Sequence, residues 1–553
     1  MKPILTSASL LLATVFCLNA ISAESQDAPD RLYPGFGDYV RPISTKSEKA
    51  QKLFNQGIQL MYGFNHDEAI RSFHAAAQAD PTAAMPWWGI AYSHGININD
   101  PAMTDERSQR ARAAADEALA RLENASPAEV ALIRAVSQRY AYPAPEDRRE
   151  LDEAFAAAMG KAFAAFPNDP DVGTIYADSL MNLQPWNYWD NEGNPIGRID
   201  EITQTLETVL ANRPDHPGAN HFYIHAVEAS QDPNRAETAA DTLRELVPGA
   251  GHLVHMPSHI YIRIGRYSDA VDSNANAIEA DRAYFAIAPK PQMYSVYYAH
   301  NQHFLAYAAM MSGRYADAMK AARDLEAEMP EENLKAYAGL IEGIMPTTFH
   351  VMIRFGKWED ILNEPAYAED RLVSNAVRHY ARSIAFSATG RTKEAREEIK
   401  AFDAAMASVP EDWYIFINSV ATVLPIARAM IQGELLYREG KYSEAYEILR
   451  QGIAAEDELI YDEPPGWMLP VRHALGALLM EQGHFAEAEK VYREDIVRNR
   501  DNGWGLLGLQ NALLAQGKNL EAAPFATKLE RVWRDADTFP SSSCFCAPFF
   551  ATR

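Results

Sequence analysis

The most regular feature of the chain is a six-residue pattern of polar and apolar positions that recurs seven times. Each copy starts with Gly and a polar residue, continues in most copies with an aromatic residue, and ends with an acid followed by Ala or Ile. Glycine can adopt the left-handed conformation that ends a helix, and the acid and Ala suit the first turn of the next helix. The pattern therefore predicts helix–turn–helix pairs with turns at 265–270, 313–318, 356–361, 390–395, 440–445, 483–488 and 517–522.

These units resemble the tetratricopeptide repeat, a pair of helices joined by such a turn and often closed by a proline, as at Pro81, Pro217 and Pro248. A weaker copy of the pattern, at residues 64–69, opens the array. The resemblance covers most of residues 47–530 and implies an all-α fold, a right-handed α-solenoid of helix–turn–helix repeats. We expect an N-terminal arm at 24–46 and a tail of different character at 531–553.

The spacing of the copies departs from the family period of about 34 residues. Gly265 and Gly313, for example, are 48 residues apart, which predicts insertions between repeats. The largest irregular segments lie near 95–107, 140–148 and 185–196. The last of these is rich in aromatic and polar residues, and it would either gate a groove or cap the end of a helix.

The histidines follow the phase of the repeats. Eight of the fifteen lie between His216 and His303, far more than an even distribution would place there. His252 and His300 each precede a turn glycine by thirteen residues, His255 and His303 by ten, and His259 by six. Side chains at these offsets share one face of a helix. The resemblance implies that this face lines the concave groove, where neighbouring first helices would bring the imidazoles together.

Histidines three or four residues apart on a helix can bind the same metal ion, since each nitrogen reaches it at about 2 Å. The predicted ligands are His221, His225, His252, His255, His259, His300 and His303. His225 is one residue out of the common phase, so we expect it in an outer shell. Seven imidazoles exceed what one tetrahedral zinc needs, which suggests two ions, outer-shell histidines or histidines that bind a substrate. Imidazole suits zinc, copper and iron, and the sequence leaves these three open.

Five further residues are candidates for the same chemistry. Glu228 takes the place of His259 when Pro217 is aligned with Pro248, and its carboxylate would offset the charge of an ion. His350 and His473 share the phase of the cluster. Cys544 and Cys546 could chelate a soft ion as thiolates, form a disulfide, or be an incidental pair in the tail.

The segments around these histidines, at 221–230, 251–260 and 297–304, are similar to those of a histidine-rich group of exported bacterial tetratricopeptide proteins. That resemblance implies no particular reaction. Met256-Pro257 interrupts one of the segments, and a helix that begins at Pro257 would leave His252 and His255 on the preceding loop.

Two functions fit this pattern. The first is a metal-binding solenoid, as a metalloenzyme or a metal carrier. The alternative is a non-catalytic adaptor that binds a peptide or an envelope protein in the groove. Peptide grooves usually carry Asn, Lys and Arg, whereas histidine occupies these offsets here, which favours metal. The sequence contains no Gly-x-Ser-x-Gly, no phosphate-binding Gly-rich loop and no His-Glu-x-x-His, so it leaves open whether any reaction is catalysed.

The net charge restricts the binding partners of the protein, and the N-terminal sequence indicates its cellular location. The net charge of −24 opposes nucleic acid and anionic membranes as partners but permits cations. Residues 1–23 combine Lys2, an apolar stretch and the ending Ile-Ser-Ala, which predicts a cleaved signal peptide and a periplasmic or secreted protein. A retained anchor or envelope attachment is the alternative. Removal of the signal would leave two cysteines, so disulfides do not build this fold.

Overall fold

The computed structural model describes residues 31–288 and 294–547, and within these ranges it is almost entirely helical. The predicted signal peptide, residues 1–23, lies outside the described residues. The strands of the described part are limited to one short antiparallel pair, β1 and β2. Within the described residues, no helix combines the length and the apolar composition that crossing a membrane requires.

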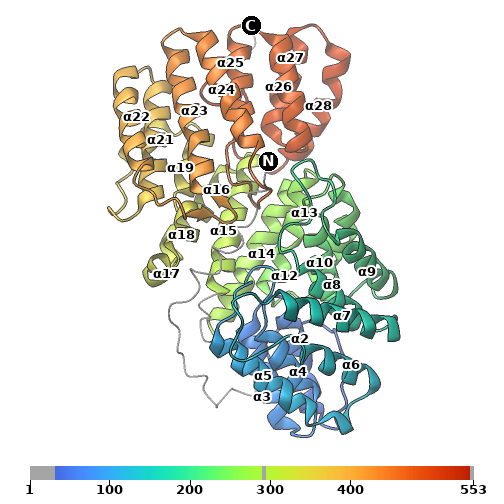
Figure 1. Cartoon of the computed structure of the whole chain (residues 1–553). Coiled ribbons are helices and arrows are strands. Elements are labelled where there is room, and N and C mark those ends of the chain that lie inside the picture. Colours follow the sequence, from blue (N-terminus) through green and yellow to red (C-terminus); the bar gives the residue numbers. More distant parts are fainter. Residues whose placement is uncertain (1–30, 289–293, 548–553) are drawn as a thin grey trace. The chain divides into compact units, whose positions relative to one another are not determined.

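The elements up to residue 288 are, in chain order, α2 (Glu48–Tyr62), α3 (His66–Ala79), α4 (Met85–Ser93), α5 (Asp105–Leu119), η1 (Leu122–Asn124), α6 (Pro127–Val136), α7 (Arg149–Ala165), α8 (Pro170–Met181), α9 (Ile199–Asn212), α10 (Pro217–Val227), η2 (Pro233–Ala236), α11 (Glu237–Leu246), α12 (Gly251–His255), α13 (Pro257–Arg263) and α14 (Tyr267–Phe285). Figure 1 shows them in blue to green.

From residue 294 onward they are α15 (Tyr294–Met311), α16 (Tyr315–Glu328), α17 (Glu331–Ala336), α18 (Ala338–Ile341), η3 (Glu342–Ile344), α19 (Thr347–Arg354), α20 (Trp358–Asn363), α21 (Leu372–Ala388), α22 (Thr392–Met406), β1 (Tyr414–Ile415), β2 (Asn418–Ser419), α23 (Val420–Arg438), α24 (Tyr442–Asp457), α25 (Val471–Glu481), α26 (Phe485–Arg498), α27 (Gly503–Ala515) and α28 (Asn519–Val532).

The chain forms two compact units. Unit 1 comprises Met1–Ile260 together with Asn276–Tyr294, and unit 2 comprises Tyr261–Ala275 together with Ser295–Arg553. Each unit contains helix pairs, such as α2 with α3 in unit 1 and α23 with α24 in unit 2, and each of these pairs packs on the next through α3 with α4 and α24 with α25. The predicted fold class, an all-α solenoid of helix–turn–helix repeats, is therefore confirmed.

The turn glycines lie where the sequence pattern predicts them, each between the two helices of a pair. All seven have positive φ angles, between 64° at Gly356 and 81° at Gly265. An L-residue with a Cβ rarely adopts this conformation, so glycine is the residue that ends these helices without strain. The backbone conformation of the turn requires glycine, and this explains why the same turn recurs in copies whose flanking sequences differ.

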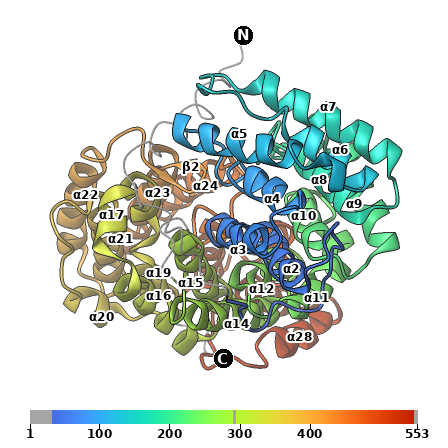
Figure 2. The same cartoon turned by 90° about the horizontal axis from the view of Figure 1, so that it is seen from below.

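Close packing in unit 1 depends on small residues at helix crossings. The ring of Phe73 on α3 lies between α2 and α4, and a Cβ added to Gly57 or Gly89 would lie 2.6 Å or 2.7 Å from that ring. α2 and α3 pack against each other, as Figure 2 shows. The two glycines let the three helices approach closely enough to bury Phe73 completely.

The described part of the N-terminal arm, residues 31–46, is held on unit 1 by polar contacts with α8. Tyr39 donates a hydrogen bond to the Asp171 carboxylate at 2.8 Å, and Arg41 forms an ion pair with the same carboxylate at 2.6 Å. Tyr62, at the end of α2, donates to Asp171 at 2.7 Å. One buried carboxylate therefore joins the arm, α2 and α8.

Met256 and Pro257 interrupt the histidine-bearing segment, as the sequence indicated, but the interruption is mild. Met256 itself keeps a helical conformation, with φ −50° and ψ −37°, between α12 and α13. His252 and His255 therefore lie on a short helix rather than on a loop, and His259 lies on the helix that follows.

Candidate metal centre

Helix α10 carries the first two histidines of the cluster. The helix begins at Pro217, whose fixed φ suits the first helical position, and the His216 side chain accepts a hydrogen bond from the Ala219 backbone N–H at 3.0 Å. His221 and His225 lie one turn apart on this helix, with ring centroids separated by 4.9 Å. Both side chains are buried, with exposed fractions of 0% and 2%.

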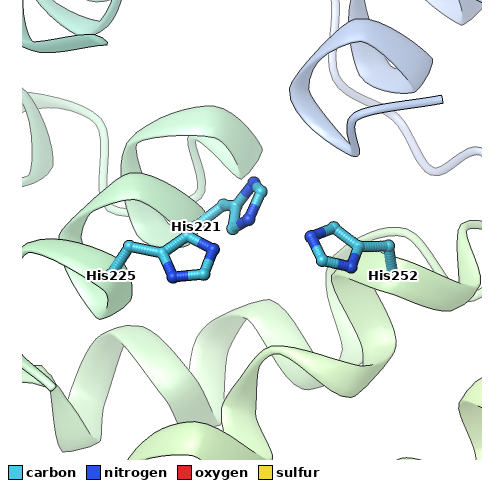
Figure 3. Close-up of side chains that lie close together, drawn as sticks. All are labelled: His221, His225 and His252. Atoms are coloured by element: carbon cyan, nitrogen blue, oxygen red, sulfur yellow. The ribbon is translucent and has the colours of Figure 1, made fainter. Parts of the chain in front are cut away.

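His252 on α12 completes a set of three imidazoles. One ring nitrogen from each of His221, His225 and His252 lies within 4.8 Å of the other two. Figure 3 shows the rings of His221 and His225 facing the ring of His252 from the neighbouring helix. Three imidazoles that converge in this way can bind one ion after a small contraction, since ligand bonds to zinc measure about 2.0–2.1 Å.

The hydrogen bonds of His221 and His225 fix which nitrogen faces the centre of the set. His221 Nδ1 lies 2.6 Å from the Tyr62 carbonyl oxygen, and His225 Nδ1 lies 3.0 Å from Glu228 Oε1. A carbonyl or carboxylate oxygen can only accept, so each Nδ1 carries the proton and each Nε2 carries a lone pair. Within the described residues, neither Nε2 has a hydrogen-bond partner. This is the arrangement of histidines that bind metal through Nε2 and are oriented through Nδ1.

The protonation state of the two imidazoles suits the same role. Burial holds the pKa of His221 well below its usual value, and the neighbouring His225 adds to this. Burial also lowers the pKa of His225 to about 3. Both rings are therefore neutral near pH 7, and the neutral imidazole is the form that binds metal ions.

Glu228 links this set to two more of the predicted ligands. Its Oε2 lies 2.7 Å from His259 Nδ1, while its Oε1 lies near His225 Nδ1. His259 Nε2 in turn lies 2.7 Å from His255 Nε2. Glu228, predicted to offset the charge of an ion, thus lies between two imidazoles that both point at it.

The structure places His225 among the candidate ligands, although its phase had suggested an outer position. The phase argument assumed one continuous helical face per repeat. Because α10 contributes two successive turns to the cluster, both of its imidazoles approach His252, with the ring centroids of His225 and His221 lying 6.5 Å and 5.0 Å from that of His252.

Phe64 covers the cluster, and sequence reasoning missed it. Its ring centroid lies 4.7 Å from that of His221 and 5.5 Å from that of His252. Phe64 occupies the turn position that holds glycine in the seven regular copies, and it has the same left-handed conformation, with φ 56°. A bulky residue in this conformation is strained by about 1–2 kcal/mol, and such strain concentrates at functional sites. A large residue in place of the turn glycine was the available signal.

The aromatic loop at 185–196 lies against the end of α10. Trp189 Nε1 donates to the Ala226 carbonyl oxygen at 2.8 Å, which satisfies one of the acceptors at this helix end. The Trp186 ring meets the His225 ring edge-to-face, with centroids 5.1 Å apart. Of the two roles considered for this loop, the described contacts are those of a helix cap.

The other predicted histidines belong to unit 2. His300 and His303 lie on α15, where their rings pack against Phe416 with centroids 5.3 Å and 5.9 Å away. His350 on α19 packs edge-to-face on Trp467 at 5.2 Å. The sharing of an ion between His300 or His303 and the histidines of α10 and α12 stays a prediction.

Two further candidates are engaged in other bonds. His473 Nε2 lies 3.0 Å from Asp495 Oδ2, and its Nδ1 lies 3.1 Å from Arg354 Nη1, so both ring nitrogens have protein partners. Cys544 and Cys546 form a disulfide with each other. In this form neither sulfur is a thiolate, the species that binds metal.

Comparisons with known proteins add little to this description. No family model matches the chain, and no curated protein matches it. Among solved structures the chain is similar to the human IFIT1 dimer with m7Gppp-AAAA, at 13% identity over 93% of this chain and 96% of that one, with a TM-score of 0.32. It is also similar to yeast Tom70, at 11% identity over 88% and 89% of the two chains, with a TM-score of 0.26. At TM-scores this low, the assignment to tetratricopeptide-type repeats rests on the helix pairs and turns of the chain itself.

Proposed function

We propose that this protein binds a transition-metal ion, such as zinc, copper or iron, through His221, His225 and His252 in a tetratricopeptide-type helical scaffold. The observation that carries the proposal is the pair of buried Nε2 atoms on His221 and His225. Both atoms lack a hydrogen-bond partner within the described residues, while the Nδ1 atoms of the same rings are held by oxygen acceptors. A metal ion would satisfy both nitrogens at once.

Energetics support this assignment over a purely structural one. A buried polar atom without a partner costs about 1–3 kcal/mol. Two such atoms are present here, on imidazoles whose ring centroids are 4.9 Å apart. A purely structural role would not require this cost, because apolar residues of similar size would pack equally well in place of the imidazoles. Charge supports it too, since the net charge of −24 favours cations.

Burial argues against the adaptor alternative for these residues. A groove that binds a peptide presents its polar side chains at the surface, where they can reach the backbone of the ligand. His221, His225 and His252 have exposed fractions of at most 2%. An ion can reach such a position, whereas an extended peptide cannot contact it without displacing the covering side chains.

The test is metal binding by the full-length protein purified without a histidine tag and stripped with a chelator. We expect Co²⁺ to bind with visible absorption bands typical of low coordination number. His221→Gln and His225→Gln should each weaken Co²⁺ binding at this site by tenfold or more, whereas His484→Gln, at an exposed histidine of unit 2, should not. Thermal unfolding of each metal-free variant checks that it folds. If folded protein binds no Co²⁺, or if the His221 and His225 variants bind as well as wild type, the proposal is wrong.

Export is part of the proposal. The basic start, apolar stretch and small-residue ending of residues 1–23 support it. Mass spectrometry of the native protein tests it: loss of residues 1–23 is the expected result, and an intact N-terminus would support the anchored alternative.

A further inference from the structure

Through its carboxylate, Glu228 contacts two of the candidate metal ligands, His225 and His259. Its carboxylate is 1% exposed, and it places one oxygen on His225 Nδ1 at 3.0 Å and the other on His259 Nδ1 at 2.7 Å. An ionised carboxylate has no proton to donate, so both imidazoles donate to it through Nδ1. Their Nε2 atoms must then both carry lone pairs. One buried carboxylate thus prepares two imidazoles for metal binding in the same way.

The lone pair of His259 faces a second imidazole rather than the first set. His259 Nε2 lies 2.7 Å from His255 Nε2, a distance typical of a hydrogen bond. Because His259 Nε2 has no proton, the His255 Nε2 proton occupies the space between the two nitrogens. On its other side His255 Nδ1 lies 3.4 Å from Ser258 Oγ, whose own proton is donated to the His255 carbonyl oxygen at 2.7 Å. The two Nε2 atoms therefore converge on a single proton.

We propose that a second divalent cation replaces this proton, bound by His255 and His259 beside the ion of the first set, with Glu228 orienting one ligand of each ion. The inference rests on the proposed function, since it extends the same centre. Two imidazoles that share a tetrahedral ion at bond lengths of about 2.0–2.1 Å place their nitrogens about 3.3 Å apart. Side-chain rotation that opens the present 2.7 Å by that amount admits the ion.

The two positions are close enough to form one two-metal centre. The ring centroids of His225 and His259 are 5.4 Å apart, and those of His252 and His255 are 5.9 Å apart. In unit 1 the second ion has two protein nitrogens, so a four-coordinate ion there keeps positions for water or an added oxygen ligand. Paired divalent ions commonly lie about 3.5–4 Å apart and bind such a ligand between them.

The experiment is a Co²⁺ titration of the stripped, untagged full-length protein, with bound metal counted by elemental analysis. We expect two ions per chain in wild type and in the exposed-site control His484→Gln, and one ion in His259→Gln. A second readout is the electron paramagnetic resonance of the Cu²⁺-loaded protein. Wild type should show coupling between two nearby ions, and His259→Gln should show an isolated ion.

The outcomes separate this inference from the proposed function. One ion in wild type, unchanged by His259→Gln and lost in His221→Gln, would overturn the second site and leave the first. Two ions in both wild type and His259→Gln, or two ions without coupling, would place the second ion elsewhere and also overturn it. No ion in folded wild type would overturn both proposals. His255→Gln tests the second ligand independently if His259→Gln fails to fold.

Discussion

Each of the two carboxylate oxygens of Glu228 faces the Nδ1 atom of a different imidazole and determines which nitrogen of that ring carries the proton. Replacing one of these oxygens is therefore a sharp mutational test. Glu228→Gln keeps one acceptor oxygen but replaces the other with an N–H donor. The imidazole that faces the donor, on His225 or His259, must then accept through Nδ1 and carry its proton on Nε2, where it blocks a metal ion. We expect Co²⁺ affinity to fall by about 10–100-fold, measured by competition with a chelator. The exposed control Glu192→Gln should bind as wild type, and equal affinities for both variants would contradict the assigned role.

A buried histidine outside the cluster predicts acid sensitivity. His94 follows α4 and is 7% exposed, and burial together with the Arg107 guanidinium lowers its pKa to about 3. Below pH 6.5 the unfolded chain therefore gains a proton on this residue that the folded chain does not, so stability falls with acidity. The loss between pH 7.5 and pH 5 is roughly 2 kcal/mol.

The measurement is urea unfolding at the two pH values. His94→Gln is expected to lower stability at pH 7.5 through imperfect packing but to remove about 2 kcal/mol of the pH-dependent loss. His484→Gln is the control, because this residue is exposed. If His94→Gln loses as much stability between the two pH values as wild type does, the neutral buried state of His94 is wrong.

At the residue scale, sequence predicted the histidines better than their surroundings. The phase of the repeats is a local property, so it singled out His221, His252 and His255 as candidates without knowledge of the fold. The Tyr62 carbonyl that orients His221 comes from the end of α2, 159 residues earlier in the chain. The covering ring of Phe64 comes from the turn that follows α2. No local pattern connects them to α10, because their role arises only when α2 packs beside that helix.

At the element scale, a distant residue caps one helix. The residue before α16, Arg314, makes no side-chain cap, and Asp537 of the tail instead accepts hydrogen bonds from the Tyr315 and Ala316 backbone N–H groups at 2.7 Å and 2.8 Å. Asp537→Ala should therefore lower the stability of unit 2 by about 1 kcal/mol, as other lost N-caps do. Chemical denaturation measures this. Ser541→Ala, at an exposed tail residue, should change stability by less than about 0.5 kcal/mol, and equal effects of the two would contradict the cap.

The N-terminal arm depends on Asp171 in a similar way. Burial alone would raise the pKa of this carboxyl, but Arg41, His216 and Tyr62 hold it well below its usual value. A depressed pKa means that the carboxylate stabilises the fold above about pH 4, and that this contribution is lost as pH falls further.

Asp171→Asn leaves Arg41 with less of its buried partner charge. We expect a loss of about 3 kcal/mol at pH 7, and a smaller difference from wild type below about pH 4. Asp215→Asn, at an exposed ion pair with Arg213, should cost less than about 1 kcal/mol. A pH-independent difference for Asp171→Asn would show that packing rather than charge explains its effect.

The helix pairs could be predicted from the sequence wherever the turn glycine recurs. The seven turn glycines marked the helix pairs because only glycine adopts φ near 64–81° without strain. The arm could not be predicted as structured, because residues 31–46 carry no periodic pattern and are held by long-range contacts such as that of Tyr39 with Asp171. The short pair β1 and β2 gave no signal either, since two residues are too few for an alternation to show.

At the scale of the whole molecule, the division into two units was not visible in the sequence. All seven regular turns lie in unit 2, and unit 1 has only the weaker copy at 64–69. The boundary nevertheless passes through a helix, because α14 contributes Tyr267–Ala275 to unit 2 and Asn276–Phe285 to unit 1. Long-range packing within each unit sets this boundary, and the positions of the turns do not give it.

Metal removal is the test at this scale. A ligand that binds only the folded state at a concentration 100 times its dissociation constant adds about 2.7 kcal/mol of stability, which corresponds to a rise in melting temperature of about 5 °C for the unit that contains the site. We therefore expect a chelator to lower the melting temperature of the metal-loaded, untagged protein by roughly that amount. His221→Gln should gain less in melting temperature from added Zn²⁺ than wild type does. If wild type is insensitive to both the chelator and Zn²⁺, no ion is bound by the folded state.

The strained turn that carries Phe64 also bears on when the centre forms. Because Tyr62 and Phe64 come from the first helical hairpin and the imidazoles from helices synthesised much later, the chain must close a long loop before the cluster is oriented and covered. Such high-contact-order pairings form late, after local helix pairs. Ordered metal capture would then mark the end of folding in unit 1: a chain truncated before α12, or one whose first hairpin has not docked, would still carry histidines but would hold an ion only weakly.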